Sequence, residues 1–170
     1  MEMNFCRRCG QALKQSEHGY VCGNGHQIFN EPAPSTGVLL VNDLREVLLA
    51  ERRAEPAKGK LNIPGGFCEL NETFEATAAR ELKEELGLLR DDYGSLRYVM
   101  SVSDPYLFGG ENTTALGVIF WAEMKRDVKV TAGDDVVGVV MIKAKDIDFS
   151  QLAFKGDRLA LRRLIELGVI

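Results

Sequence analysis

The stretch that most constrains the fold runs from Pro64 to Leu88, where a glycine-containing loop leads into a long acidic segment. Apolar residues recur in this segment at every fourth position, which predicts a single buried stripe on a helix. Gly87 is a typical C-terminal stop for such a helix. The sequence therefore predicts a helix over residues 73–88 whose buried stripe consists of Phe74, Ala78, Leu82 and Leu86.

Three glutamates flank this stripe and are candidates for chemistry. At about 100° per residue, Glu81 and Glu85 lie one turn apart on the same side, and Glu84 is displaced further round. Like charges at this spacing destabilise a helix by about 0.2–0.5 kcal/mol, and a divalent cation such as Mg²⁺ or Mn²⁺ offsets that cost. A solvated acidic face is the interpretation that these residues alone favour, because Glu is a good helix former.

The whole segment resembles the Nudix box, G-x5-E-x7-R-E-U-x-E-E-x-G-U with U an aliphatic residue. Every fixed position agrees, at Gly66, Glu72, Arg80, Glu81, Leu82, Glu84, Glu85, Gly87 and Leu88. This resemblance favours a metal site over a solvated helix face. It also implies the family's fold, an α/β/α sandwich with a mixed sheet between helices.

The resemblance also implies roles for individual residues. Glu72 and Arg80 would form the family's structural pair, which ties the loop to the helix through charge-assisted hydrogen bonds. Glu84 would be an additional metal ligand or a water-activating group. The expected ligands of Mg²⁺ or Mn²⁺ are therefore Glu81, Glu85, Glu84 and the carbonyl of Gly65.

Near the N-terminus, the spacing C-x2-C-x12-C-x3-H predicts a second metal site, at Cys6, Cys9, Cys22 and His26. Four such ligands suit tetrahedral Zn²⁺ and leave no open position for substrate, so the zinc is expected to be structural. A segment this short cannot bury enough apolar surface to fold without the metal. His18 lies in a polar loop and is expected to be solvated.

A proline-containing connector, residues 30–35, separates this module from the rest of the chain, so we predict a zinc ribbon at 1–33 and a Nudix domain at 34–170. Residues 36–41 and 46–52 are predicted to form a hairpin around Asn42 and Asp43. Further strands are expected at 96–102, 116–121 and 136–142, and a second helix at 154–167.

Composition narrows the functional class. The net charge of −4 argues against a dedicated nucleic-acid binder. The apolar runs are far shorter than the roughly 18–20 residues that cross a bilayer as a helix. The N-terminus has no secretory pattern, and three of the four cysteines belong to the metal-like motif. We therefore expect a cytoplasmic protein without a membrane partner, and a homodimer is an open possibility.

Substrate-binding residues are less sharply indicated. Tyr106 and Phe108 are the candidates for stacking on a nucleobase, although an aromatic pair after a proline also suits a packed loop. Weaker candidates are Asp134 and Asp135 as an acidic loop near the metals, and Lys58 and Lys60 as phosphate contacts. Cys68 is interpreted as a packing residue.

The predicted function is metal-dependent hydrolysis of the diphosphate linkage in ADP-ribose-like compounds, nucleotide sugars or dinucleotides. A zinc ribbon before a Nudix domain is similar to the NADH pyrophosphatase-like branch. That branch, however, uses four cysteines and an SQPWPFPxS signature, which residues 101–108 lack. The alternatives are therefore an NADH pyrophosphatase, an RNA cap-removing enzyme that uses Arg7 and Arg8, and a non-catalytic nucleotide sensor.

Overall fold

The computed structural model describes residues 3–108, 110–133 and 135–170. A six-stranded sheet has the order β6-β5-β4-β8-β7, with β9 paired to β5. Strands β4 and β8 are parallel and the other neighbours are antiparallel, so the sheet is mixed. Its strands are β4 (Ala33–Val41), β5 (Glu46–Arg52), β6 (Leu61–Asn62), β7 (Arg97–Phe108), β8 (Glu111–Glu123) and β9 (Val136–Lys143).

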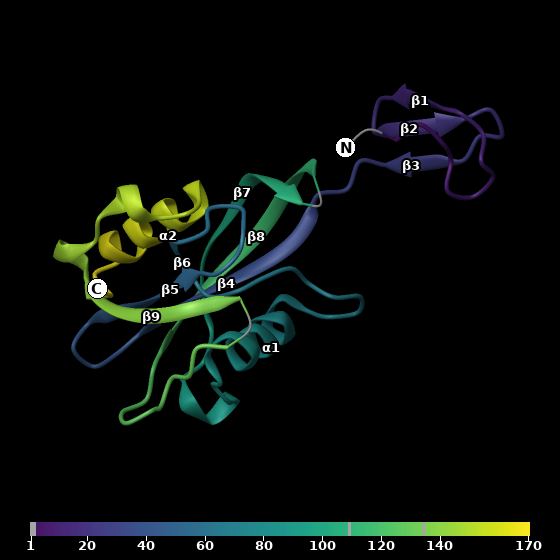
Figure 1. The fold of residues 1–170 in the computed structure, drawn as a ribbon. Coiled ribbons are helices and arrows are strands. Elements are labelled where there is room, and N and C mark those ends of the chain that lie inside the picture. The colour runs from purple at the N-terminus through teal and green to yellow at the C-terminus, as the bar shows by residue number, and fades with distance from the viewer. Residues whose placement is uncertain (1–2, 109, 134) are drawn as a thin grey trace.

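Helices α1 (Phe74–Leu86) and α2 (Lys155–Glu166) cover opposite faces of this sheet (Figure 1). The expected α/β/α sandwich is therefore confirmed. Within the described residues, no helix combines the length and the apolarity needed to cross a membrane. Three short 3-10 helices complete the main body: η1 (Arg90–Asp92), η2 (Ala144–Asp146) and η3 (Phe149–Gln151).

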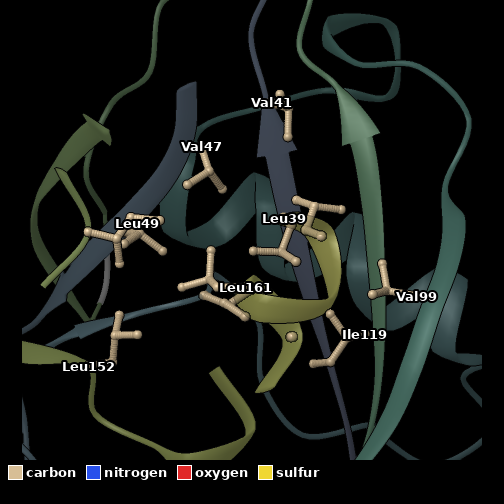
Figure 2. Packing of buried hydrophobic residues seen from close by; sticks show 12 residues of the cluster. Leu39, Val41, Val47, Leu49, Val99, Ile119, Leu152 and Leu161 are labelled. Carbon is tan, nitrogen blue, oxygen red and sulfur yellow. The ribbon is translucent and has the colours of Figure 1, made fainter. Parts of the chain in front are cut away.

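The core has two halves because successive residues of a strand point to opposite faces of the sheet. Val38 and Leu40 of β4 pack with the α1 stripe, in which Ala78, Leu82 and Leu86 are fully buried. Leu39 and Val41 point to the other face of the sheet. In Figure 2 they lie near Val47 and Leu49 of β5 and near Leu161 of α2. Each helix thus buries one apolar face against one side of the sheet.

Helix α1 begins and ends where its capping residues predict. Thr73 is the N-cap, and its side chain accepts a hydrogen bond from the backbone N–H of Ala76 at 3.2 Å. Gly87 is the C-cap with φ of 69°, a left-handed conformation that glycine adopts without a steric cost. The predicted helix at 73–88 is therefore confirmed with its caps at 73 and 87.

The strands differ from the prediction chiefly in length. Strands β7 and β8 form a long antiparallel hairpin of 12 and 13 residues, about twice the predicted length. Pro105 had suggested a loop, but β7 lies at the edge of the sheet, where a residue without an N–H is tolerated. The predicted hairpin of β4 and β5 is present, but each strand pairs mainly elsewhere, with β8 and β9 respectively.

The N-terminal module is a separate antiparallel sheet of β1 (Leu13–Ser16), β2 (Gly19–Cys22) and β3 (Gln27–Phe29). It lies beyond the start of β4 (Figure 1). Its buried residues are Cys6, Cys22 and Ile28. Since β4 already begins at Ala33, the connector between the two sheets is shorter than the six residues of the predicted 30–35 segment. The domain boundary at 33/34 stays a prediction.

Candidate metal and substrate site

A cavity of about 530 Å³ lies where the glycine loop, α1, the strands and the start of α2 meet. This volume is within the range of roughly 300–1,000 Å³ that small-molecule sites occupy. Among the predicted site residues, the cavity is lined by Gly65, Cys68, Arg80, Glu81, Glu84, Glu85, Tyr106 and Asp135. The structure thus brings the Nudix-box residues and one of the aromatic candidates into one space.

Arg80 is the centre of a hydrogen-bond network that ties the loop to α1. Its Nε donates to Glu72 Oε1 at 2.9 Å and its Nη2 to Glu72 Oε2 at 3.1 Å. Nη2 also donates to the carbonyl of Phe67 at 2.9 Å. The hydrogen bonds from Arg80, with further bonds from the Glu69 backbone and the Thr77 hydroxyl, lower the pKa of Glu72 to about 2. This geometry suits a positioning role.

Replacing Arg80 with lysine is expected to loosen the loop, because an ammonium cannot reproduce the planar fork of a guanidinium. We expect Arg80→Lys to lower the Tm by about 4–8 °C, as a loss of about 2 kcal/mol would in a chain of this size. Thermal unfolding followed by circular dichroism measures this shift. Arg163→Lys, at an exposed i,i+3 ion pair on α2, is the matched control and should leave the Tm unchanged. Equal Tm values for the parent and Arg80→Lys would contradict the assignment.

Glu85 is the most buried of the three box glutamates, with 9% of its surface exposed. Its Oε2 accepts a hydrogen bond from the backbone N–H of Gly65 at 2.9 Å. Burial raises the pKa of Glu85 to about 8, the Gly65 hydrogen bond opposes this shift, and the nearby Glu81 carboxylate adds to it. A buried carboxylate of this kind becomes favourable in its charged form when a cation replaces the proton.

Glu81 and Glu84 both accept hydrogen bonds from Arg80 Nη1, at 2.8 and 3.0 Å. Burial raises the pKa of Glu81 as well. With the carbonyl of Gly65, the three carboxylates form a set of hard oxygen donors, which suits Mg²⁺ or Mn²⁺. Among the described residues, the oxygens of these three glutamates do not form a cluster as compact as that of the four N-terminal ligand atoms. Each carboxylate that accepts from Arg80 uses one oxygen for it, so its second oxygen is the one that could bind a cation.

The two glycines of the loop allow it to approach both β4 and α1. Gly65 has φ of 146°, and a Cβ there would lie 2.1 Å from the carbonyl oxygen of Thr36. A Cβ at Gly66 would lie 2.4 Å from Glu81 Oε1. The carbonyls on either side of Gly65, those of Pro64 and Gly66, accept hydrogen bonds from β4. A Cβ at Gly65 would therefore push the loop away from β4, and a Cβ at Gly66 would displace the Glu81 carboxylate.

Sequence reasoning missed several residues that line the same cavity. Arg52 comes from β5, Asp104 from β7, Phe154 and Asp157 from the start of α2, and Phe67 from the glycine loop itself. Isolated charges and aromatics on separate elements have no spacing signal, so only the fold brings them together. Lys58 and Lys60, which were weak candidates, are not among the lining residues, and Lys60 Nζ donates to the Ser150 carbonyl at 2.8 Å. The cavity-lining cation from that region is Arg52.

Tyr106 lies on β7 and not in a loop, so the packed-loop alternative is wrong for this residue. Its ring contacts Phe67 edge-on at 5.1 Å between centroids and Phe154 at 5.7 Å. The side chain of Phe108 and the whole of Asp134 lie outside the described residues. The stacking role of Tyr106 therefore stays a prediction, and that of Phe108 has no structural test.

Asp157 is a buried acid whose protonation couples folding to pH. Burial raises its pKa to about 7, although backbone hydrogen bonds from Phe154 and Ile63 oppose the shift. The unfolded chain releases this proton near pH 3.9. Between these values the unfolded state binds fewer protons than the folded state, so stability falls as pH rises from about 4 to about 7.

Asp157→Asn replaces the titrating carboxyl group with an amide. We therefore expect the free energy of unfolding to depend less on pH between about pH 4 and pH 7. Urea denaturation of the parent and the variant at pH 4.5 and pH 7.5 measures the difference. Asp146→Asn, at an exposed position that does not line the cavity, serves as the control. An Asp157→Asn curve that runs parallel to the parent's would contradict this prediction.

The four predicted zinc ligands are brought together by the N-terminal module. One ligand atom from each of Cys6, Cys9, Cys22 and His26 lies within 4.8 Å of all the others. The Sγ atoms of Cys9 and Cys22 are 3.7 Å apart, and Cys6 Sγ is 3.6 Å from His26 Nδ1. Zn–S bonds of about 2.3 Å and a Zn–N bond of about 2.0 Å give tetrahedral edges of about 3.8 and 3.5 Å. The spacing fits a tetrahedral ion.

Two backbone turns hold these ligands in place. The N–H of Gly10 donates to the Cys6 carbonyl at 2.8 Å, and the N–H of Gly25 donates to the Cys22 carbonyl at 2.9 Å. Both glycines have positive φ, at 72° and 76°. Each pair of ligands therefore lies on a tight turn, which the positive φ of a glycine permits. His18 is exposed and lies outside the cluster.

A family model described as a NUDIX domain matches residues 31–164. The human mitochondrial NAD(P)H pyrophosphatase NUDT13 is 35% identical over 107 residues, which cover 62% of this chain and 29% of that protein. The ADP-ribose pyrophosphatase of Methanocaldococcus jannaschii is 38% identical over 64 residues, which cover 38% of this chain and 37% of that protein. The matched regions thus span only about a third of these curated relatives.

A solved structure extends the likeness over nearly the whole chain. The crystal structure of a NUDIX hydrolase from Nitrosomonas europaea matches with a TM-score of 0.70 and 26% sequence identity. The match covers 96% of this chain and 91% of that one. Coverage this high includes most of the N-terminal module as well as the sandwich.

Proposed function

The chain belongs to the Nudix family, and we propose that it hydrolyses the diphosphate linkage of nucleoside diphosphate derivatives such as ADP-ribose, nucleotide sugars or dinucleotides. The observation that carries this proposal is the shared cavity, in which the box glutamates lie with Arg52, Tyr106 and Phe154. Its acidic side suits cations that a diphosphate needs, and its aromatic side suits a planar base. Both halves of a nucleotide thus find complementary chemistry there.

The reaction that fits this site is attack by water on one phosphorus. A P–O bond forms to the water oxygen, the bond to the bridging oxygen breaks, and two phosphate monoesters leave with the released proton. For ADP-ribose the products are AMP and ribose 5-phosphate. Divalent cations held by Glu81, Glu84, Glu85 and the Gly65 carbonyl would supply charge neutralisation and Lewis acidity.

The chain's own residues supply binding and positioning. Arg80 holds the loop through Glu72 and Phe67, so that Gly65 stays beside Glu85. We assign Glu72 and Arg80 to positioning and the three box glutamates to the reacting centre. Glu84 is half exposed and keeps the additional role of ligand or water-activating group. Arg52 offers a guanidinium that suits a phosphate oxygen.

Three alternatives stay open. An NADH pyrophosphatase is favoured by the similarity to human NUDT13. A cap-removing enzyme would need an RNA surface, for which exposed Arg7 and Arg8 are the basic residues on the N-terminal module. A nucleotide sensor is disfavoured because all three box glutamates are present.

We further propose that a zinc ribbon at 1–33 holds a structural Zn²⁺ and that a Nudix domain spans 34–170. We also propose a cytoplasmic location, and a homodimer stays a prediction.

The experiment that tests this function measures turnover against ADP-ribose, NADH, dinucleoside polyphosphates, nucleoside triphosphates and capped RNA, each with Mg²⁺ or Mn²⁺. Metal-dependent cleavage of ADP-ribose or a related small compound is expected to be fastest. Preferential cleavage of NADH or capped RNA would favour the corresponding alternative. Binding of nucleotides without turnover of any compound would favour the sensor and contradict the proposal.

A further inference from the structure

Small residues of β4 and β8 form part of the cavity lining. Strands β4 and β8 run parallel there, with Ser35 opposite Gly117. On the other side of β8, β7 pairs Ala115 with Asp104 and Gly117 with Val102. Because small side chains stand beside large ones on neighbouring strands, the sheet leaves room above Ala115 and Gly117, and both line the cavity.

An unbroken series of contacts forms one wall of this space. The guanidinium of Arg52 lies 5.0 Å from the centre of the Phe154 ring. Phe154 contacts Tyr106, and Tyr106 contacts Phe67, whose carbonyl is bonded to Arg80. The wall therefore links the aromatic end directly to the loop that holds the glutamates. A planar ligand that packs on Tyr106 and Phe154 would have its phosphates within reach of Arg52.

Two acidic side chains project into the same space beside the start of α2. Asp104 is 9% exposed, and its Oδ2 accepts a hydrogen bond from the N–H of Gly156 at 2.8 Å. Asp157, three residues after Phe154, accepts from the Phe154 N–H at 3.3 Å and belongs to the helix cap. The carboxyl group of Asp157 thus serves to cap the helix. The carboxylate of Asp104 uses one of its two oxygens for a backbone hydrogen bond.

The second oxygen of Asp104 faces the cavity. Among the described residues, the Gly156 N–H is the one hydrogen-bond partner of the Asp104 carboxylate, and no fully buried side-chain oxygen lacks a partner. Oδ1 must therefore be accessible, and Asp104 lines the cavity. An ionised carboxylate oxygen accepts hydrogen bonds only, and it repels a ligand that offers an acceptor or a negative charge.

We propose that Asp104 is a specificity-determining residue whose Oδ1 accepts a hydrogen bond from a donor group of an adenosine moiety that packs on Tyr106 and Phe154. The donor is the exocyclic amine of the base or a hydroxyl of the ribose, which share this chemistry. This proposal rests on the proposed function, because it places the nucleoside at one end of the cavity and the phosphates toward Arg52 and the glutamates. It extends that function by selecting adenosine compounds over inosine or deoxyribose ones.

The test measures binding of AMP, IMP and 2′-deoxy-AMP by isothermal titration calorimetry. AMP has no diphosphate to cleave, so the result does not depend on turnover and separates this proposal from the proposed function. The variants are Asp104→Asn, which keeps an amide oxygen for the Gly156 N–H, and Ala115→Leu, which fills the room above Ala115. Asp146→Asn is the matched control at an exposed site.

If the exocyclic amine is the donor, we expect the parent and Asp146→Asn to bind AMP about tenfold more tightly than IMP. If the ribose hydroxyl is the donor, we expect them to bind AMP about tenfold more tightly than 2′-deoxy-AMP. Asp104→Asn should reduce that preference to about twofold or less, and Ala115→Leu should weaken AMP binding about tenfold. A parent without either preference, or without AMP binding at millimolar concentration, overturns the proposal. An Asp104→Asn variant that is folded and keeps the parent's preference also overturns it. If Asp104→Asn does not fold, unchanged AMP binding by Ala115→Leu overturns it.

Discussion

Glu85→Gln is expected to lower kcat for metal-dependent hydrolysis by about 10³-fold, which is about 4 kcal/mol in the activation free energy. The glutamine carries no charge to offset that of a cation, and Glu85 is the most buried of the three box glutamates. The fold should be unaffected, because the amide oxygen can still accept the hydrogen bond from the Gly65 N–H. Steady-state kinetics with saturating Mg²⁺, together with the Tm, measure both effects.

Glu75→Gln is the matched control, since Glu75 lies on the same helix but is exposed in its first turn. It should keep the parent's kcat. A Glu85→Gln variant that retains more than about a tenth of the parent's kcat would show that Glu85 is not an essential ligand. A loss of activity with a large fall in Tm would assign Glu85 to folding instead.

Cys22→Ser is expected to abolish zinc binding and to unfold the N-terminal module while the sandwich stays folded. Cys22 is buried in the small core of the module, and its Sγ lies 3.7 Å from that of Cys9. Zinc sites of this kind contribute on the order of 10 kcal/mol to folding, far more than three short strands provide. Elemental analysis of zinc and limited proteolysis of residues 3–29 measure the two effects.

Cys68→Ser is the matched control, because Cys68 is remote from the cluster in sequence and belongs to the glycine loop. It should keep one zinc ion per chain and a protease-resistant module. A Cys22→Ser protein in which residues 3–29 stay resistant after metal removal would contradict a structural role for zinc.

The parts of the structure that sequence reasoning predicted are those with a short-range signal. The α1 stripe follows from helix geometry, because its members lie four residues apart, and Gly87 is a typical stop for such a helix. The cysteine spacing predicted the zinc cluster, because each pair of ligands lies three or four residues apart. The resemblance to the Nudix box supplied the expected sandwich, the Arg80–Glu72 pair and the acidic side of the site.

The rest depended on the way distant strands align. Asp104 on β7 meets Gly156 of α2 across 52 residues, and no spacing rule connects them. Pro105 suggested a loop because its lack of an N–H is tolerated only when the strand lies at the sheet edge, which the sequence does not reveal. Arg52 rather than Lys58 or Lys60 lines the cavity because β5 runs up to Arg52 and the lysines follow in the turn beyond it.

The most direct test of the central claim is ³¹P NMR of the purified protein with ADP-ribose, first in the presence of EDTA and then after Mg²⁺ is added in excess. We expect no change with EDTA and, after Mg²⁺, replacement of the diphosphate signals by the monoester signals of AMP and ribose 5-phosphate. Diphosphate signals that persist with Mg²⁺ and with Mn²⁺, in a folded protein that still binds AMP, would contradict it.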